Sequence, residues 1–481
     1  MALNRRLIVV SNRVPPSESF EEQGKGEASA GGLVTAVRAA MELSGGMWFG
    51  WSGRTSRRRV TMGPTVRVFG RLQHATMDLS GDEVSQFYLG YSNRTLWPLL
   101  HSFPSHVDIR SQTYRTYRRV NRRFASSLLP LLSRDDLIWV QDFHLFHLGY
   151  ELRRMGWRGK IGFFLHVPFP PAEIFNILPW SHDTLQALLG YDLVGLHNER
   201  YMHNLVDSLD IELSGESHGD TYYYEGNATR LGVFPIGIDP DTFRPKKAHW
   251  NNGGQDDGSG GFNGNGKRSL VDELSLASTP DLQLILGVDR LDYTKGIPNR
   301  LRIFERMLER HPNLRNKLIY IQISSPSRTR VPEYVQEKEQ VERLVGQING
   351  RFSEAGWVPI RYLYRSYAQS DLAGFDHDAD VCLVTPLRDG MNLVAKEFVA
   401  AQGEDSPGVL VLSRFAGAAS TMHDAVIVNP YDIDGTAEAT YQALRMPLEE
   451  RRRRNRKLLS VVEKHSSQNW SRTFTATLQA L

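Results

Sequence analysis

The segment VTPLRDGMNLVAKEFVAAQ, residues 384–402, joins the end of an apolar run to the start of a helical pattern. The apolar run stops at Pro386, and an Arg-Asp-Gly turn follows it directly. In sheets of parallel strands, ligands bind beyond the carboxyl ends of the strands. The N-terminus of the next helix brings free N–H groups and a positive dipole to the same place, which suits an anion. We therefore predict a ligand site here, with Asp389 and Glu397 as acceptors for sugar hydroxyls.

A structural role for the same two residues is the alternative. In that interpretation Asp389 caps the helix, and Glu397 interacts with the positive end of the helix dipole. For this segment taken alone, the structural role is the better explanation.

Short apolar runs rich in β-branched residues recur along the whole chain, separated by segments with helical spacing. Runs that are apolar on both faces and alternate with helices are typical of parallel sheets covered on both sides. The runs lie at 7–12, 137–143, 160–167 and 192–198 in the first half, and at 282–290, 317–324, 360–365, 379–386, 408–414 and 425–430 in the second. The predicted fold class is α/β, with two Rossmann-like parallel-sheet domains.

The length of 481 residues exceeds what one hydrophobic core usually supports, which favours two domains. Segment 251–267 is dense in Gly, Asn and Asp and cannot bury apolar surface, so we read it as a linker rather than as a long surface loop inside one domain. The predicted parts are an N-terminal domain at 1–245, a linker at 246–275, a C-terminal domain at 276–455 and a C-terminal helix at 456–481 that crosses back to the N-terminal domain. Two such domains facing each other would share a cleft at their strand ends.

The composition is that of an ordinary soluble globular protein, with 41% hydrophobic and 23% charged residues. The formal net charge of +3 is too small to indicate nucleic-acid or membrane binding. No stretch has the length needed to span a bilayer, and the arginine run at 451–454 is better explained as a solvated helical face than as a nucleic-acid patch. The single cysteine, Cys382, excludes an internal disulfide and suits a reducing compartment. We expect a cytoplasmic protein without a nucleic-acid or membrane partner.

Two cations follow another apolar run in the segment GVDRLDYTKGIPNR, residues 287–300. Arg290 and Lys295 lie at a predicted strand end and precede a helix. Together they could neutralise a diphosphate leaving group without a metal ion. Either cation alone would be an ordinary surface charge, but two of them in the same class of loop as Asp389 favour a nucleotide-diphosphate site.

The first half of the chain has a comparable design for a second ligand. Arg13 ends the first apolar run, and Gly31 and Gly32 open an amphipathic helix where the backbone could approach a phosphate, although no GxGxxG fingerprint is present. The polar loop at 15–30 between them could act as a mobile lid.

Further polar and aromatic candidates lie in the same half. Asp142 and His166 follow predicted strands, and Tyr88 and Trp97 could stack on a sugar, although core packing is the safer interpretation for isolated aromatic residues. The histidines at 144, 147 and 166 lack the spacing of metal ligands, and we predict no metal site.

At this point the motifs match a known family. The chain resembles the bacterial trehalose-6-phosphate synthases, retaining transferases of glycosyltransferase family 20 with the GT-B fold. The matching motifs are VVSNR (9–13), SAGGL (29–33), WFGWSG (48–53), SNRTLWP (92–98), FFLHVPFP (163–170), RLDYTKGIP (290–298), TPLRDGMNLVAKE (385–397) and GVLVLSRFAGAA (408–419). They cover most of the chain in order, so a chance similarity is implausible.

The resemblance implies an activity and two substrate sites. Members transfer glucose from a nucleotide-diphosphate sugar, usually UDP-glucose, to C1 of glucose 6-phosphate. The residues implied for the donor are Gly31, Gly32, Arg290, Lys295, Tyr367, Asp389, Leu393, Val394, Ala395, Lys396 and Glu397. Those implied for the acceptor are Arg13, Tyr88, Trp97, Asp142 and Arg328. The implied catalytic set is Asp142, His166, Arg290, Lys295 and Asp389.

Individual roles follow from the same resemblance. Arg290 and Lys295 would bind the diphosphate, Glu397 the ribose, and Tyr367 the base. Asp389 and His166 would surround the transferred glucose. The two glycines would approach the donor phosphates.

On the acceptor side, Arg13, Tyr88 and Arg328 would hold the 6-phosphate, while Trp97 and Asp142 would line the sugar. The substrates themselves are the only small-molecule partners expected, with no cofactor and no metal ion.

Four alternatives stay open. The acceptor could differ, as in glucosylglycerol-phosphate synthase, which uses glycerol 3-phosphate. The chain could be a non-catalytic regulatory subunit of a trehalose-synthesis complex, although Arg290, Lys295, Asp389 and Glu397 are all present. The base could be uridine, guanosine or adenosine, and a homo-oligomer, dimer or tetramer, is an alternative to a single chain. Segments 15–30 and 251–267 are longer than the resemblance leads us to expect.

Overall fold

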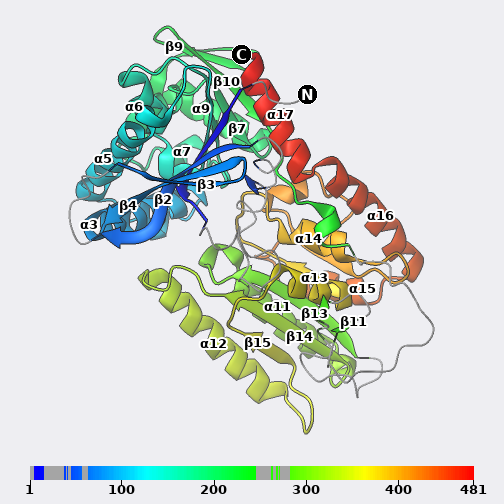
Figure 1. Cartoon of the computed structure of the whole chain (residues 1–481). Coiled ribbons are helices and arrows are strands. Elements are labelled where there is room, and N and C mark those ends of the chain that lie inside the picture. Colours follow the sequence, from blue (N-terminus) through cyan, green and yellow to red (C-terminus); the bar gives the residue numbers. More distant parts are fainter. Residues whose placement is uncertain are drawn as a thin grey trace. The chain divides into compact units, whose positions relative to one another are not determined.

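A computed structural model describes residues 5–15, 37, 38, 41, 45–56, 63–244, 262, 263, 267, 268, 270 and 282–481 (Figure 1). The chain divides into two compact units. The first comprises the described residues before Gly237 together with Ser467–Leu481, and the second spans Gly237–Ser466. The predicted limits at 245, 275 and 455 stay predictions, and Gly31, Gly32, the loop at 16–30 and nearly all of segment 251–267 lie outside the described residues.

The first unit is built on one large sheet whose strand order, within the described residues, is β3-β4-β2-β1-β5-β6-β7-β10-β9-β8. Its strands are β1 (Leu7–Arg13), β2 (Gly46–Ser56), β3 (Thr65–Phe69), β4 (Leu72–Ser80), β5 (Leu137–Gln141), β6 (Ile161–Phe164), β7 (Leu193–Leu196), β8 (Glu216–His218), β9 (Thr221–Tyr224) and β10 (Asn227–Val233). In this order, the strands from β4 through β2, β1, β5, β6 and β7 to β10 are parallel. Antiparallel pairing is confined to β3 at one edge and to β9 and β8 at the other. The order of the sheet reverses between β1 and β5.

Helices cover this sheet. They are α3 (Gly81–Glu83), α4 (Trp97–Leu100), α5 (Ser111–Leu128), α6 (Leu148–Arg154), α7 (Ala172–Phe175), α8 (Ser181–Leu188), α9 (Glu199–Leu213) and α17 (Ser467–Ala480). A π-helix, Val84–Leu96, joins α3 to α4. Such segments are rare and are frequent at functional sites.

Helix α17 completes the first unit although it follows the whole second unit in the chain (Figure 1). Its Trp470 and Phe474 rings lie 4.7 and 4.9 Å from the ring of Trp139 in β5. The neighbouring strands meet it with glycines, because a Cβ at Gly162 or Gly195 would come within 2.8 Å of Phe474. The helix is therefore part of the apolar core of this unit.

The second unit contains a sheet of six described strands in the order β15-β14-β13-β16-β17-β18, with every pair parallel. The strands are β13 (Gln283–Arg290), β14 (Leu318–Ser325), β15 (Ile360–Leu363), β16 (Val381–Val384), β17 (Val409–Ser413) and β18 (Val426–Val428). This is the order 3-2-1-4-5-6 of a Rossmann fold, so the α/β prediction is confirmed. Ligands of such sheets bind where the order reverses, here between β13 and β16.

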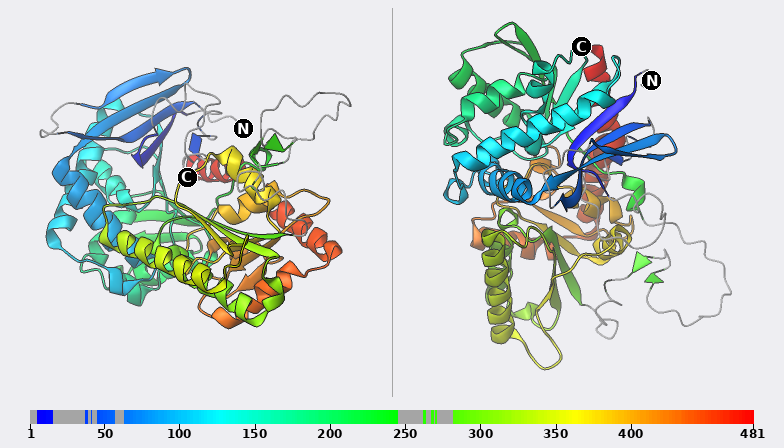
Figure 2. Two further views of the ribbon diagram at one scale, coloured as in Figure 1. Left: turned by 90° about the horizontal axis from the view of Figure 1, so that it is seen from below. Right: turned by 60° about the vertical axis from the view of Figure 1, so that its left-hand side comes forward.

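The helices of the second unit are α11 (Ile297–Arg310), α12 (Pro332–Phe352), α13 (Gln369–Asp378), α14 (Val394–Ala401), α15 (Ile433–Leu444) and α16 (Leu448–Lys464). The long helix α12 packs along β15 (Figure 2). Gly296, at φ 65°, and Pro298 set the entry into α11, whose buried face includes Leu301, Phe304 and Leu308. This spacing of three and four residues is that of an amphipathic helix.

Candidate active site

The reversal point of the second sheet brings two loops together. The loop after β13 contains the short 3₁₀-helix Tyr293–Lys295, and the loop after β16 leads into α14. The Thr294 carbonyl accepts hydrogen bonds from the N–H groups of Leu387, at 2.8 Å, and of Arg388, at 3.4 Å. The two loops are therefore joined through their backbones.

Two of the predicted site residues form an ion pair there. Lys295 Nζ lies 2.5 Å from Asp389 Oδ2, and the two side chains are only 11% and 12% exposed. The Asn392 amide donates to the same oxygen at 3.0 Å, and the Gly390 N–H donates to Asp389 Oδ1 at 2.9 Å. A buried carboxylate with this many donors has a fixed orientation.

The start of α14 is shaped by Asn392. Its backbone has φ 70°, a left-handed conformation, and its Oδ1 accepts from the Ala395 N–H at 3.2 Å. Asn392 thus supplies the side-chain oxygen at the helix start, while Asp389 turns toward Lys295. Left-handed non-glycine residues are costly and cluster at functional sites.

Two titratable residues lie in the first turn of α14. Lys396 is fully buried, and burial lowers its pKa to about 7. Burial likewise raises the pKa of the half-buried Glu397 to about 7. The positive end of the α14 dipole favours an anion here. The N–H groups of Lys396 and Glu397 themselves donate to the Leu393 carbonyl, both at 2.9 Å.

Two further predicted cations, Arg290 and Arg328, belong to the same unit. Arg290 is exposed at the last position of β13, paired across the sheet with Ser325. Arg328 Nη1 lies 3.2 Å from Oδ2 of Asp292, whose side chain is fully buried in the loop that carries Lys295. Arg328 is itself left-handed, at φ 44°.

A buried arginine in α11 contacts the ends of the two strands that lead into these loops. Arg300 in α11 is 0% exposed and donates to Asp289 Oδ2 at 2.5 Å and to Thr385 Oγ1 at 2.9 Å. These partners end β13 and follow β16, so one side chain ties the two strand ends together. Removing one partner of such a pair leaves an uncompensated buried charge.

A third loop, after β17, supports Asp389. The Asp389 N–H donates to the Phe415 carbonyl at 3.2 Å, and the Ala418 N–H donates to the Met391 carbonyl at 2.8 Å. The approach is so close that a Cβ on Gly417 would lie 1.7 Å from the Gly390 carbonyl oxygen.

Tyr367, expected near the base, is 6% exposed. Its hydroxyl accepts from Arg365 Nε at 2.6 Å, and its ring lies 5.0 Å from that of Phe375.

In the first unit the predicted residues lie at the carboxyl ends of β1, β5 and β6. Arg13 ends β1, and Asp142 follows β5 with φ 73°. Asp142 Oδ1 accepts from the His166 N–H at 3.1 Å, and His166 Nε2 lies 2.8 Å from Gln141 Oε1. Burial, with a smaller effect of His197, holds the pKa of His166 well below its usual value, so this imidazole is neutral.

The Arg13 side chain lies over a glycine that sequence reasoning did not select. A Cβ on Gly53 would come within 2.6 Å of Arg13 Nε, and Gly53 has φ 84°. Gly53 belongs to the WFGWSG motif. A glycine inside a strand often marks a place where another group approaches closely, and this was the signal that could have identified it.

The two aromatic candidates differ in their surroundings. Tyr88, in the π-helix, is half-buried and stacks on His144 with ring centres 5.9 Å apart. Trp97 is 5% exposed and packs against His101 and Phe143 at 4.1 and 5.9 Å.

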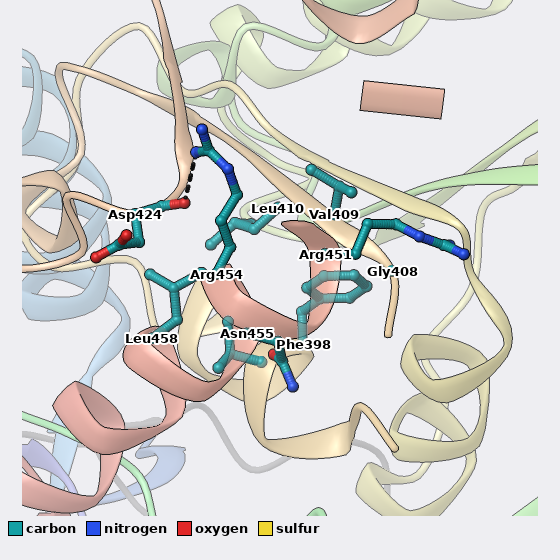
Figure 3. Close-up of a pocket in the computed structure, with 10 residues that line it drawn as sticks. Phe398, Gly408, Val409, Leu410, Asp424, Arg451, Arg454, Asn455 and Leu458 are labelled. Carbon is teal, nitrogen blue, oxygen red and sulfur yellow. Dashed lines mark hydrogen bonds between the residues drawn. The ribbon is translucent and has the colours of Figure 1, made fainter. Parts of the chain in front are cut away.

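A small pocket in the second unit lies away from these loops (Figure 3). It lies at the amino end of β17, the end opposite to the site, and Phe398, Val409 and Leu458 are among its lining residues. Arg454 Nη1 donates to the Asp424 carbonyl at 2.9 Å beside it. Within the described ranges, no helix is long and apolar enough to cross a membrane, and no group of three or more His, Cys, Asp and Glu side chains could hold a metal ion.

Comparison with known proteins identifies the family of this chain. The family model of glycosyltransferase family 20 matches residues 5–253 and 265–480. The chain belongs to glycosyltransferase family 20. A family relative, the trehalose-6-phosphate synthase of Citrobacter koseri, is 40% identical over 478 residues, covering 98% of this chain and 95% of the relative.

Solved structures of the family agree. An alpha,alpha-trehalose-phosphate synthase (UDP-forming) from Burkholderia xenovorans, in complex with glucose-6-phosphate, has a TM-score of 0.90 and 39% identity and covers 98% of this chain and 100% of that one. A structure from E. coli bound with UDP-2-fluoro glucose has a TM-score of 0.89 and 38% identity, with 99% coverage of both chains. The chain therefore has the GT-B fold of these transferases.

Proposed function

We propose that this protein is a retaining glucosyltransferase that makes trehalose 6-phosphate from UDP-glucose and glucose 6-phosphate. The observation that carries the proposal is the buried Lys295–Asp389 pair at the reversal point of a Rossmann sheet, beside the start of α14, in a chain of family 20. Relatives described with glucose-6-phosphate and with a UDP-glucose analogue support the choice of substrates.

The donor would be held by charge and by the start of α14. Arg290 and Lys295 bind the diphosphate, the backbone from Leu393 to Glu397 and the Glu397 carboxylate hold the nucleotide, and Asp389 accepts from glucose hydroxyls. Tyr367 lies against the base, with Gly31 and Gly32 near the phosphates. Of these groups, the two cations and the positive end of the α14 dipole favour the negative charge that develops on the departing diphosphate.

The acceptor would be held by Arg13, Tyr88 and Arg328 at its 6-phosphate and by Trp97 and Asp142 at its sugar. In the transfer, the bond from glucose C1 to the diphosphate breaks, and a bond to the acceptor hydroxyl oxygen forms on the same face. The hydroxyl proton passes to the departing phosphate oxygen. The neutral His166 serves as a hydrogen-bonding group beside the transferred glucose.

The wider proposal concerns the whole protein. We place the acceptor domain at residues 1–245 and the nucleotide-sugar domain at residues 276–455, with the helix at 456–481 crossing back. Arg328 would reach the acceptor from the second domain, and Gly31 and Gly32 would reach the donor from the first. The enzyme would need neither cofactor nor metal ion and would work in the cytoplasm on small-molecule substrates.

One assay tests the proposal. The purified chain is offered UDP-, GDP- or ADP-glucose, first with glucose 6-phosphate and then with glycerol 3-phosphate, and nucleotide diphosphate release is coupled to a spectrophotometric readout. Turnover is expected with UDP-glucose and glucose 6-phosphate. Preference for glycerol 3-phosphate would identify a glucosylglycerol-phosphate synthase instead. A folded chain without turnover in any combination would indicate a regulatory subunit.

A further inference from the structure

One buried carboxylate, that of Asp292, contacts both the donor loop and the arginine expected at the acceptor phosphate. Its side chain is 0% exposed, and each of its oxygens has two hydrogen-bond donors. Oδ1 accepts from the N–H and the hydroxyl of Thr294, at 3.0 and 2.9 Å. Oδ2 accepts from Arg328 Nη1 at 3.2 Å and from the Tyr334 hydroxyl at 2.9 Å.

The hydrogen bonds that Oδ2 accepts, here called the Oδ2 arm, fix Arg328; those that Oδ1 accepts are called the Oδ1 arm. Tyr334, in the first turn of α12, contacts Arg328 Nη1 through its hydroxyl, and its ring centre lies 5.4 Å from the guanidinium carbon. Arg328 is only 8% exposed and has the left-handed φ of 44°. A strained backbone of this kind persists only where its surroundings determine it, and Asp292 and Tyr334 are such surroundings.

The Oδ1 arm fixes the donor loop. Thr294 precedes Lys295, and its carbonyl accepts from Leu387 and Arg388 in the loop that carries Asp389. The Lys295 N–H also donates to the Asp292 carbonyl at 3.0 Å. Asp292 is therefore hydrogen-bonded to Lys295 directly and, through Thr294, to the loop that carries Asp389.

The charges around Asp292 agree with this geometry. Burial alone would raise its pKa, but Arg328, Arg290 and Lys295 hold the pKa below its usual value, so the carboxylate is ionised. On α12, Glu337 faces the same region, and burial together with Asp292 raises the pKa of Glu337 to about 7. Asp292 is thus a permanent counter-charge shared by the donor and acceptor cations.

We propose that Asp292 is a positioning residue that holds the acceptor-phosphate arginine, Arg328, and the diphosphate-binding loop of Lys295 in one connected frame. The inference rests on the proposed function, because it takes its two ligands from it. An amide at this position has one acceptor atom and one donor group, so it cannot serve both arms of the carboxylate.

Three variants separate the arms. Asp292→Asn removes the charge, Tyr334→Phe removes a donor of the Oδ2 arm, and Thr294→Val removes the hydroxyl of the Oδ1 arm. The control is Tyr441→Phe in α15, where the tyrosine ring stacks on His311 with ring centres 3.5 Å apart. Steady-state kinetics give KM for UDP-glucose and for glucose 6-phosphate separately, and thermal unfolding reports the stability of each variant.

We expect the two single-arm variants to affect the KM values of different substrates. Asp292→Asn raises KM for both substrates, by about tenfold for glucose 6-phosphate, as for a lost charge-assisted hydrogen bond. Tyr334→Phe raises KM for glucose 6-phosphate and leaves KM for UDP-glucose within about twofold, and Thr294→Val does the reverse. A purely structural role would lower the unfolding temperature without this difference between the substrates.

Other outcomes overturn the inference. It is wrong if Asp292→Asn changes neither KM, or if Tyr334→Phe and Thr294→Val affect both substrates equally. Should Asp292→Asn not fold, the two single-arm variants decide alone. A wild-type chain that is inactive with this substrate pair refutes the proposed function itself, whereas an active wild type with unchanged variants refutes only the role of Asp292.

Discussion

At the scale of single residues, the Lys295 ammonium is the charge on which the proposed chemistry depends most. Lys295→Met keeps the apolar stem but removes the charge that would stabilise the departing diphosphate. We expect kcat to fall by about 10²–10³, as for the loss of one transition-state donor, with folding retained. The coupled assay measures this, and Lys457→Met on the exposed face of α16 is the control. A folded Lys295→Met variant with normal turnover would contradict the assignment.

Gly53 gives a second residue-scale prediction. In Gly53→Ala the new Cβ would displace the Arg13 guanidinium, because it would lie within 2.7 Å of two of its nitrogens. We expect KM for glucose 6-phosphate to rise about tenfold, as for a lost hydrogen bond to a charged group, with a smaller change in KM for UDP-glucose.

Gly70→Ala is the matched control for Gly53→Ala. Gly70 also has a positive φ, of 58°, but a Cβ there would meet no described atom within 4 Å. Equal kinetic effects in the two variants would show that backbone strain, and not Arg13, is responsible.

Some individual site residues were predictable from the sequence, and others were not. Lys295 and Asp389 were selected because they follow strand ends, and the structure joins them as an ion pair. Asp292 is not among the predicted site residues, because its importance comes from hydrogen bonds to Arg328 and Tyr334, which are far away in the sequence. Asn392 is also not among them, although its bonds to Asp389 and Ala395 are local. Whether the selected residues bind substrate stays a prediction.

At the scale of elements, the loop after β17 holds the Asp389 loop by backbone contact. Gly417→Ala would place its Cβ 1.7 Å from the Gly390 carbonyl oxygen and force the loops apart. We expect a loss of about 1–3 kcal/mol in the free energy of unfolding, typical of overpacking, and a further loss of donor affinity. Urea denaturation and UDP titration measure the two effects.

The control for Gly417→Ala is Gly346→Ala in α12, where a Cβ has open space. Alanine favours a helix over glycine, so this control should not be destabilised. A Gly417→Ala variant as stable as the control would show that the two loops separate without cost.

Helix α14 carries a buried amine that makes stability depend on pH. The pKa of Lys396 falls from 10.5 in the unfolded chain to about 7 on folding, so between these values the unfolded state binds more protons. Above pH 10.5 the amine is neutral in both states and the folded state bears no cost. As the pH falls from 10.5, the free energy of unfolding decreases, and the loss is complete once the pH has fallen through about 7.

The variant Lys396→Met isolates this effect. The free energy of unfolding of the wild type relative to the variant should rise from pH 7 toward pH 10 by up to about 1.4 kcal/mol per unit. Denaturation at several pH values measures it, and His465, whose pKa is lowered by burial and by Lys396, contributes little above pH 7. A constant difference across this range would mean that Lys396 is charged in the folded protein.

Elements with continuous apolar runs were predictable, and the others were not. The run at 137–143 became β5 (Leu137–Gln141) because all five residues of that strand are buried. Strand β3, Thr65–Phe69, gave no such signal because four of its five residues are exposed at the sheet edge. Strand β8, at the other edge, gave no signal for the same reason, because all three of its residues are exposed. Strand β9 also lacks a two-sided apolar pattern, since only one of its four residues, Tyr222, is buried.

At the scale of the whole molecule, the first unit depends on a helix that belongs to a distant part of the chain. Phe474 is fully buried against Trp139, Gly162 and Gly195. Phe474→Ala should lower the free energy of unfolding of this unit by about 3–5 kcal/mol through the cavity it leaves. Urea denaturation measures the loss, with the exposed Thr473→Ala as control, and equal stabilities would contradict the packing role.

The α/β class was predictable from strand runs alternating with helices, but the order of the strands was not. Sequence shows which segments are strands, whereas the order 3-2-1-4-5-6 arises from crossover connections that reverse between β13 and β16. The predicted sequence pattern therefore groups Lys295 and Asp389 in one site, and the strand order shows that their loops follow neighbouring strands.

The late position of α17 has a consequence for synthesis in the cell. The ribosome makes the second unit between the sheet of the first unit and the helix that seals it. At about 5–20 residues per second this interval lasts roughly ten to fifty seconds, during which Trp139 and its apolar neighbours lack their cover. The nascent chain should therefore need protection by a holding chaperone until Phe474 leaves the exit tunnel.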